Sequence, residues 1–228
     1  MKNHLKRIAT PRTWVIDRKC NTFICRPSAG AHSYENGLPL GIILRDILKL
    51  SSSMTEVKKL LNNNDILVDG KRRKNHHYIV GLFDVLNIPT TKKAYRIVFD
   101  NKGRIVVKEC DEKESGFKIC KIVGKTILTK GRVQYNLHDG KNIISEEKAK
   151  VGDSLMLTLP KLEIKEVLPL EKNVTVFLTK GKHSGDIGKF KEINANVAVY
   201  TKDKQDVETD KNYLFVIGKD KPKINFEN

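Results

Sequence analysis

The alternation of hydrophobic and polar residues changes along the chain, and each change indicates a different kind of structure. Residues 1–40 show no regular period, because Pro11, Pro27 and Pro39 interrupt the segment and basic side chains alternate with isolated apolar ones. A segment this basic, with so little continuous apolar pattern, cannot bury a core of its own. We therefore expect residues 1–40 to form an extended basic arm that orders only against a partner.

Residues 41–62 follow a helical period. Apolar residues from Ile43 to Leu50 recur on one face and predict a first helix, which ends at the serines of positions 51–53. Ser53 and Glu56 have the S-x-x-E spacing of a capping box, which predicts that a second helix begins there. Three asparagines at positions 62–64 end this second helix.

A β-hairpin with a basic tip is predicted directly after the second helix. A short strand at 66–68 leads into Asp69-Gly70, the strongest short signal for a tight turn. Four consecutive cations at 71–74 follow the turn and are expected at an exposed tip. Together with a closing strand at 85–88, this order resembles the small RNA-binding module of bacterial ribosomal protein four, some pseudouridine synthases and tyrosyl-tRNA synthetases. In that module the basic face of the two helices and the strand turn hold structured RNA.

From residue 95 onward the sequence has the short, regularly spaced strands of a barrel or sandwich. A hairpin is predicted over 95–107, and further strands at 118–123, 126–128, 133–137, 154–159, 162–167, 174–178, 189–193 and 195–200. The pattern predicts a multidomain α+β protein. Its parts are the arm at 1–40, a small α/β RNA-binding module at 41–94, a central β-barrel-like domain at 95–170 and a second small β-barrel-like domain at 171–228.

Charge adds a functional expectation to this organisation. The chain of 228 residues holds 43 Lys and Arg against 27 Asp and Glu, a formal charge of +16. The first 105 residues hold 20 of these cations against 8 acids, so they carry +12 of the +16. Charge concentrated in one half of a chain is the footprint of a polyanion-binding surface, and we expect nucleic acid as the partner. The alternative is a lysine-rich solvated surface without a partner.

Cations of the arm, the module and a glycine-rich loop are the candidate RNA-binding residues. Gly181–Lys189 follows an alternating strand and resembles the KOW motif of ribosomal and transcription-elongation proteins, which predicts an SH3-like barrel at the C-terminus. Whether this loop contacts RNA or only shapes the barrel stays open. Trp14 and Phe23 could stack on bases or anchor the arm on its own protein. The candidates are Lys2, Lys6, Arg7, Arg12, Arg18, Lys19, Arg26, Arg45, Lys49, Lys71, Arg72, Arg73, Lys74, Lys182, His183 and Lys189.

Several other classes of protein lack support in the sequence. No window is long and apolar enough for a membrane span, and no apolar stretch follows the basic N-terminus, so we expect a cytoplasmic protein. The four cysteines match neither a zinc knuckle nor a disulfide framework. Gly124-Lys125-Thr126 lacks the earlier glycine and the helix of a nucleotide-binding loop. His76-His77 and His138-Asp139 lack further ligands or a nucleophile at organised spacing. We therefore predict no enzyme activity, cofactor, metal or small-molecule substrate.

Taken in order, these segments resemble one family over nearly the whole chain, the small-subunit ribosomal protein four of archaea and eukaryotes, the "e" type. The resemblance implies a structural component that binds small-subunit ribosomal RNA beside neighbouring small-subunit proteins. A KOW-type RNA-binding transcription or translation factor is the alternative. The chain departs from the family pattern at Ala31 and Lys141. The supporting stretches are 4–7 with Ala9, Pro11, Arg12 and Trp14; Phe23 with 26–27; 38–40 with 44–46; 68–71; 80–82 with 84–85; and 136–140 with Asn142.

Overall fold

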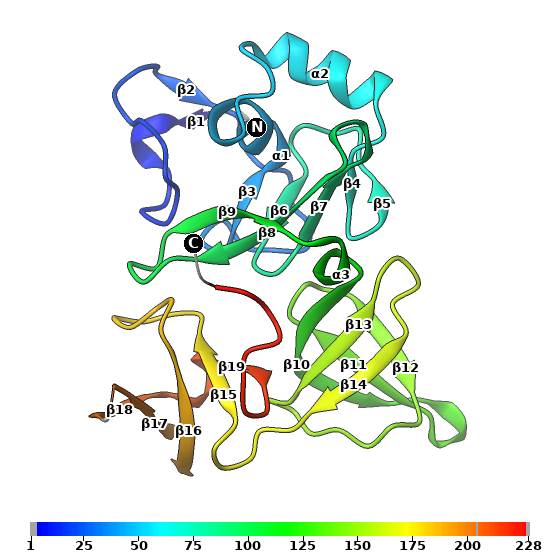
Figure 1. The fold of residues 1–228 in the computed structure, drawn as a ribbon, viewed down its shortest axis with the longest axis vertical. Coiled ribbons are helices and arrows are strands. Elements are labelled where there is room, and N and C mark those ends of the chain that lie inside the picture. The colour runs from blue at the N-terminus through cyan, green and yellow to red at the C-terminus, as the bar shows by residue number, and fades with distance from the viewer. Residues whose placement is uncertain (1–3, 204, 227–228) are drawn as a thin grey trace. The chain divides into compact units, whose positions relative to one another are not determined.

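The structure, a computed structural model, describes residues 4–203 and 205–226. It divides the chain into two compact units (Figure 1). Unit 1 comprises Met1–Val98 and Arg104–Gly116, and unit 2 comprises Phe99–Gly103 and Phe117–Asn228. The division into four parts at residues 40, 94 and 170 remains a prediction within this arrangement.

The basic arm of unit 1 packs against its own protein, which corrects the expectation that it orders only against a partner. Its short strands β1 (Leu5–Lys6) and β2 (Phe23–Ile24) pair antiparallel. Trp14 is only 2% exposed, and its indole Nε1 donates to the carbonyl oxygen of Tyr34 at 2.8 Å. The arm gains its order because this buried aromatic side chain has both apolar contacts and a hydrogen-bond acceptor. Trp14 is therefore an anchor, whereas Phe23 is 55% exposed.

Two helical segments follow the arm, as the apolar period predicts. The first is shorter than expected and consists of α1 (Leu40–Ile42) and a π-helical turn at Ile43–Ile47. It ends where Lys49 takes a left-handed backbone conformation with φ of 52°. The second is α2 (Met54–Asn63), which begins at the predicted capping box. Among the described residues, no helix is long and apolar enough to cross a membrane.

The capping box at the start of α2 gives the first testable prediction. The Ser53 hydroxyl accepts from the backbone N–H of Glu56 at 3.2 Å, and the Glu56 carboxylate accepts from the backbone N–H of Ser53 at 3.3 Å. We expect Ser53→Ala to destabilise unit 1 by about 1 kcal/mol, because it leaves a helix amide without its acceptor. Urea unfolding measures this loss. Ser53→Asp, which restores an acceptor, should recover most of it, and an unchanged midpoint in Ser53→Ala would contradict the cap.

A twisted sheet in the order β5-β4-β7-β8-β9 forms the body of unit 1. The predicted hairpin turn is confirmed, with Asp69 and Gly70 at φ of 50° and 73°, as a tight two-residue turn requires. The hairpin predicted over 95–107 corresponds to strands β8 and β9 of this sheet, in which β8 also pairs with β7. The strands of this sheet are β4 (Leu67–Val68), β5 (Lys71–Arg72), β7 (Val85–Ile88), β8 (Lys93–Phe99) and β9 (Ile105–Cys110). A separate two-stranded sheet pairs β3 (Gly37–Pro39) with β6 (Ile79–Gly81), and the short helix α3 (Glu112–Ser115) follows β9.

The first sheet of unit 2 has the antiparallel order β12-β11-β10-β13-β14. Tyr135, Leu137, Leu155 and Leu157 lie in its core with Ile122. The strands predicted at 118–123 and 126–128 form one continuous strand, because the bulge between Ile122 and Gly124 keeps β10 paired with β11 beyond it. Strand β12 was not predicted. The elements are β10 (Phe117–Ile127), β11 (Val133–Leu137), β12 (Asn142–Ser145), β13 (Ser154–Thr158) and β14 (Ile164–Leu168).

The second sheet of unit 2 has the order β18-β17-β16-β15-β19. Strands β15, β16 and β17 correspond to the strands predicted at 174–178, 189–193 and 195–200. Strands β18 and β19 were not predicted. The glycine-rich segment joins β15 to β16, and Gly181 and Gly185 both have φ near 90°, a conformation that a side chain rarely adopts. The elements are β15 (Thr175–Leu178), β16 (Ile187–Asn194), β17 (Val197–Lys202), β18 (Gln205–Asp210) and β19 (Leu214–Gly218).

Candidate nucleic-acid interface

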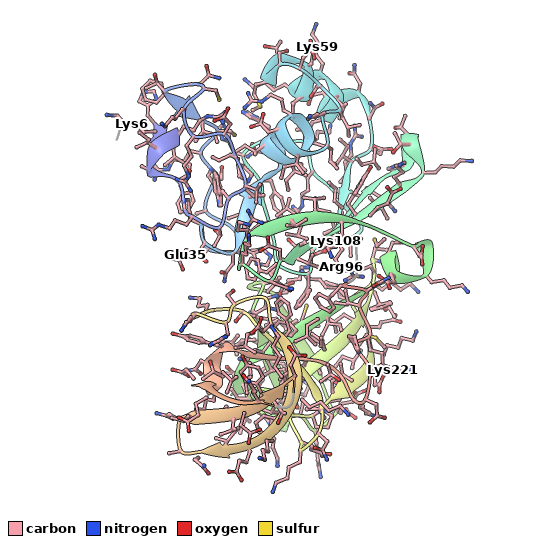
Figure 2. All side chains as sticks on the ribbon, turned by 60° about the vertical axis from the view of Figure 1, so that its left-hand side comes forward. Lys6, Glu35, Lys59, Arg96, Lys108 and Lys221 are labelled. Carbon is pink, nitrogen blue, oxygen red and sulfur yellow. The ribbon has the colours of Figure 1, made fainter. Side chains whose placement is uncertain are left out.

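Many basic side chains of unit 1 project into solvent and are free to meet an external anion. Within the described part of the chain they are exposed and form no ion pair. They come from the arm, the end of the first helical segment, helix α2 and the β4–β5 turn. Figure 2 shows Lys6 of the arm and Lys59 of α2 at the outside of this unit. The set consists of Lys6, Arg12, Lys19, Lys49, Lys58, Lys59, Lys71 and Lys74.

Two arginines of the arm, Arg7 and Arg18, serve its internal structure instead. Arg7 is only 4% exposed, and its guanidinium donates to the carbonyl oxygen of Asp17 at 2.6 Å. Arg18 donates to the carbonyl oxygens of Thr10 and Pro11 at 2.9 and 2.7 Å. Arg7 was predicted to contact RNA, but its burial leaves it little surface for a phosphate. The planar guanidinium, with its several donors, instead holds the irregular backbone of the arm in place.

Arg26 and Arg45 are half-buried and also have partners within the protein. The Nε of Arg26 donates to the Tyr34 hydroxyl at 2.8 Å. Arg45 forms an ion pair with Asp46, with 2.7 Å between Nε and Oδ1. The hydrogen bond that the Arg45 guanidinium donates to the Asp46 carboxylate raises the pKa of Arg45 above its usual value.

A groove of about 850 Å³ runs beside Arg45, but its charges cancel. Three basic and three acidic side chains line the groove, so it has no excess of positive charge. The acidic ones come from the arm, the first helical segment and α2. Phosphate recognition needs such an excess. The structure therefore does not gather these cations into one anion pocket. The charged lining residues are Arg7, Arg45 and Lys49, and Asp17, Asp46 and Glu56.

The basic tip after the β4–β5 turn divides into two pairs of cations. Arg72 forms an ion pair with Asp65 at 2.9 Å and donates to the carbonyl oxygen of Asn62 at 2.9 Å. The guanidinium of Arg73 stacks over the ring of Tyr78, 4.3 Å from its centroid. Lys71 and Lys74, on either side of the two arginines in the sequence, are exposed. The arginines thus fix the conformation of the tip, and the lysines are the mobile point charges that can neutralise phosphates.

The glycine-rich loop of unit 2 presents a smaller set of charges. Lys182 and Lys189 are exposed. His183 lies 3.4 Å from the carboxylate of Asp186, and Lys202 forms a closer ion pair with the same carboxylate at 2.6 Å. His183 is therefore held within the loop, whereas Lys182 and Lys189 can reach a partner.

Sequence reasoning missed Lys58 and Lys59, although a signal was available. In the helical period of α2, Val57 and Leu61 are buried, so the positions between them face solvent. Both lysines are exposed on that outer face. Lys2, the first of the predicted cations, lies outside the described residues.

A buried charge cluster in unit 2 was also missed, because His138-Asp139-Gly140 has the pattern of an ordinary turn. The ammonium of Lys118 lies 2.8 Å from Asp139, and both side chains are fully buried. Lys141 lies 3.0 Å from the same carboxylate. Burial alone would raise the pKa of Asp139, but the charges of Lys118 and Lys141 outweigh it and hold that pKa well below its usual range. The ion pair between Lys118 and Asp139 therefore ties β10 to the loop after β11.

Comparisons with known proteins identify relatives of this chain. Residues 91–164 match the model of the ribosomal family S4e, and residues 1–35 match the RS4NT (NUC023) domain. The chain is 45% identical to the small ribosomal subunit protein eS4 of Methanothermobacter thermautotrophicus, an alignment that covers 98% of this chain and 96% of that protein. It is 43% identical to the protein of the same name from Methanocella arvoryzae, with 97% of each chain covered.

A solved structure shows the same fold. The crystal structure of the 30S ribosomal protein S4e from Thermoplasma acidophilum superposes with a TM-score of 0.71 at 30% sequence identity. The match covers 81% of this chain and 96% of that one. Identity at this level over almost the full length, together with the shared fold, shows common descent. The chain therefore belongs to the ribosomal protein S4e family.

Proposed function

We propose that the protein is a structural constituent of the small ribosomal subunit in the cytoplasm, where it binds small-subunit ribosomal RNA and supports subunit assembly and translation. The observation that carries the proposal is the set of exposed, unpaired lysines on unit 1. Family membership supports the same role, since its relatives are named small ribosomal subunit proteins. A KOW-type factor that works away from the ribosome is not favoured by these relatives.

The binding mechanism is the neutralisation of phosphates that approach one another in folded RNA. Lys71 and Lys74 at the basic tip, with Lys58 and Lys59 on α2, come from neighbouring parts of unit 1 and offer point charges on flexible stems. Such charges bind the sugar-phosphate backbone and fix register and orientation without reading sequence. Neighbouring small-subunit proteins are expected against the remaining surfaces. The second sheet of unit 2 is proposed as an SH3-like barrel whose KOW loop contributes Lys182 and Lys189.

The basic tip gives a direct test on purified small-subunit ribosomal RNA. We expect Lys71→Ala/Lys74→Ala to weaken RNA binding roughly tenfold at physiological salt. The slope of log affinity against log salt should become shallower by about 1.5, because two counterion-releasing contacts are lost. Arg72 and Arg73 are left in place so that the tip keeps its conformation. Filter binding over a series of salt concentrations measures both quantities.

The matched control removes the same charge from unit 2. Lys211 and Lys221 are exposed lysines that do not belong to the proposed interface residues, and Lys211→Ala/Lys221→Ala should leave the slope nearly unchanged. Equal slopes for the two double variants would show that binding follows net charge and not the tip. Sedimentation of the tagged protein with small subunits through a sucrose gradient at moderate salt then separates a ribosomal constituent from a free factor.

A further inference from the structure

Three metal-binding side chains that lie far apart in the sequence meet in unit 1. Cys25, which directly follows β2 in the arm, lies beside His76 and His77, which precede β6. One donor atom of each residue lies within 4.8 Å of the donor atoms of the other two. The Sγ of Cys25 is 3.3 Å from Nδ1 of His77, and the two imidazole rings have centroids 4.0 Å apart. The sequence could not show this cluster, because 50 residues separate Cys25 from the histidines.

We propose that Cys25, His76 and His77 form a binding site for one Zn²⁺ ion, with water as the fourth ligand. Thiolate sulfur and imidazole nitrogen are the ligands that zinc prefers, and three protein ligands with one open position are an established arrangement. Zinc bonds of about 2.3 Å to sulfur and about 2.0 Å to nitrogen, at a tetrahedral angle, place the two donors about 3.5 Å apart. The observed separation between Cys25 and His77 is close to that value.

The backbone around the histidines is held in place before any metal binds. The carbonyl oxygen of His76 accepts from the backbone N–H of Gly41 at 2.9 Å, and that of His77 accepts from the backbone N–H of Ser28 at 2.8 Å. The side chain of Asn75 accepts from the backbone N–H of His77 at 2.9 Å. Gly41 permits this approach, since a Cβ there would lie 3.1 Å from the His76 carbonyl oxygen. Fixed ligand positions lower the ordering cost of metal binding.

Protons must leave two of the donors when the metal binds. Burial raises the pKa of the Cys25 thiol to about 11, so the free thiol is protonated at neutral pH and its proton is released to solvent. Nδ1 of His77 lies 2.6 Å from the carbonyl oxygen of Arg26 and donates its proton there in the metal-free protein. A metal on Nδ1 takes the position that this carbonyl oxygen now occupies, so the Arg26 carbonyl must move aside when the metal binds, and the ring then keeps its single proton on Nε2. His77 also lines a pocket of about 600 Å³, which gives the fourth ligand access from solvent.

A second cluster of similar composition, formed by Cys120, His138 and Asp139, is less suited to binding a metal ion. Its carboxylate is already neutralised by Lys118 at 2.8 Å and by Lys141 at 3.0 Å. A cation there would have to displace a fully buried ammonium group. Within the described residues, the Cys25 cluster is therefore the better of the two for a metal, and Cys120 provides an internal comparison.

Cobalt(II) titration of the full-length chain, purified in the presence of a chelator and a phosphine reductant, tests the site. We expect saturation at one equivalent, with a thiolate-to-cobalt charge-transfer band and strong tetrahedral visible bands. Cys25→Ser should abolish the charge-transfer band, and His76→Gln should weaken binding at least about tenfold. Cys20→Ser, at an exposed cysteine of the same unit, should keep both features. Absence of the band in the unmodified chain, or its persistence in Cys25→Ser, would overturn the proposal.

A second test uses the unmodified protein, so it does not depend on whether the variants fold. Alkylation by iodoacetamide, followed by peptide mass spectrometry, reports each cysteine separately. One equivalent of Zn²⁺ should slow the alkylation of Cys25 at least tenfold while leaving that of Cys20 unchanged. Equal rates for Cys25 with and without Zn²⁺ would refute the site.

Discussion

Asp139→Asn is expected to destabilise unit 2 by about 3–5 kcal/mol, the cost of leaving a buried charge without its counter-charge. The ammonium of Lys118 has no exposed surface, and the carboxylate of Asp139 at 2.8 Å is the negative charge that offsets its burial. Asparagine keeps the size of the side chain and an oxygen for the backbone N–H of Lys141, but removes the charge. Urea unfolding, followed by circular dichroism of the full chain, measures the loss.

A double variant separates the charge effect from a packing effect. Lys118→Met/Asp139→Asn removes both charges, so no buried ion is left unpaired, and it should be about 2 kcal/mol more stable than Asp139→Asn alone. If the double variant were no more stable than the single one, the ion pair would not be the source of the loss.

The same pair fixes the direction of the pH dependence. The folded-state pKa of Asp139 lies below its unfolded value of about 3.8, so the carboxylate contributes its full stabilisation above that pH. The contribution is lost as the pH falls through the folded-state pKa. The difference in stability between the natural chain and Asp139→Asn should therefore be constant above about pH 5 and shrink below about pH 4.

The elements that local chemistry determines could be predicted from the sequence. Ser53 and Glu56 specify the start of α2, and Asp69-Gly70 specifies the β4–β5 turn, because both signals act over a few residues. Strands β18 and β19 were missed for different reasons. The exposed β18 has many polar residues and little apolar alternation. Strand β19 is a continuous apolar run in which every residue is buried, so a local signal was available and was overlooked. Only its pairing with β15, about forty residues earlier in the chain, leaves no short-range signal.

The candidate interface shows the same division between local and long-range information. Exposed lysines such as Lys71 and Lys74 could be identified from a basic run after a turn. That Arg7 is buried could not, since its partners Asp17 and Asp46 are 10 and 39 positions away. The charge of the sequence indicates which part of the chain binds a polyanion. The fold determines which of its cations remain exposed and without an internal partner. The free ones in the basic tip are the two lysines, and the two arginines support them.

Gly81→Ala is expected to cost unit 1 about 3–5 kcal/mol, because the added methyl group clashes with the ring of His32. The backbone of Gly81 has no positive φ, so the loss does not come from backbone conformation. A Cβ at this position would lie 2.2 Å from Cγ of His32, well inside van der Waals contact. The ring cannot move aside freely, because it is buried and its Nε2 lies 3.0 Å from the Asp84 carboxylate. That carboxylate also accepts from the backbone N–H of Gly81 at 2.9 Å.

Moving His32 therefore disrupts a buried polar pair as well as the packing, and the two losses add. Gly116→Ala provides the matched control in the same unit, since its nearest atom would be 3.7 Å away, and it should change the stability by less than about 0.5 kcal/mol. His32→Ala/Gly81→Ala gives the added methyl group room and should cost less than the sum of the two single changes. Thermal and urea unfolding of the natural chain, the double variant and the three single variants Gly81→Ala, Gly116→Ala and His32→Ala measure these differences. A Gly81→Ala chain as stable as Gly116→Ala would show that the ring of His32 is free to move, and that the His32–Asp84 pair does not hold β6 against the arm.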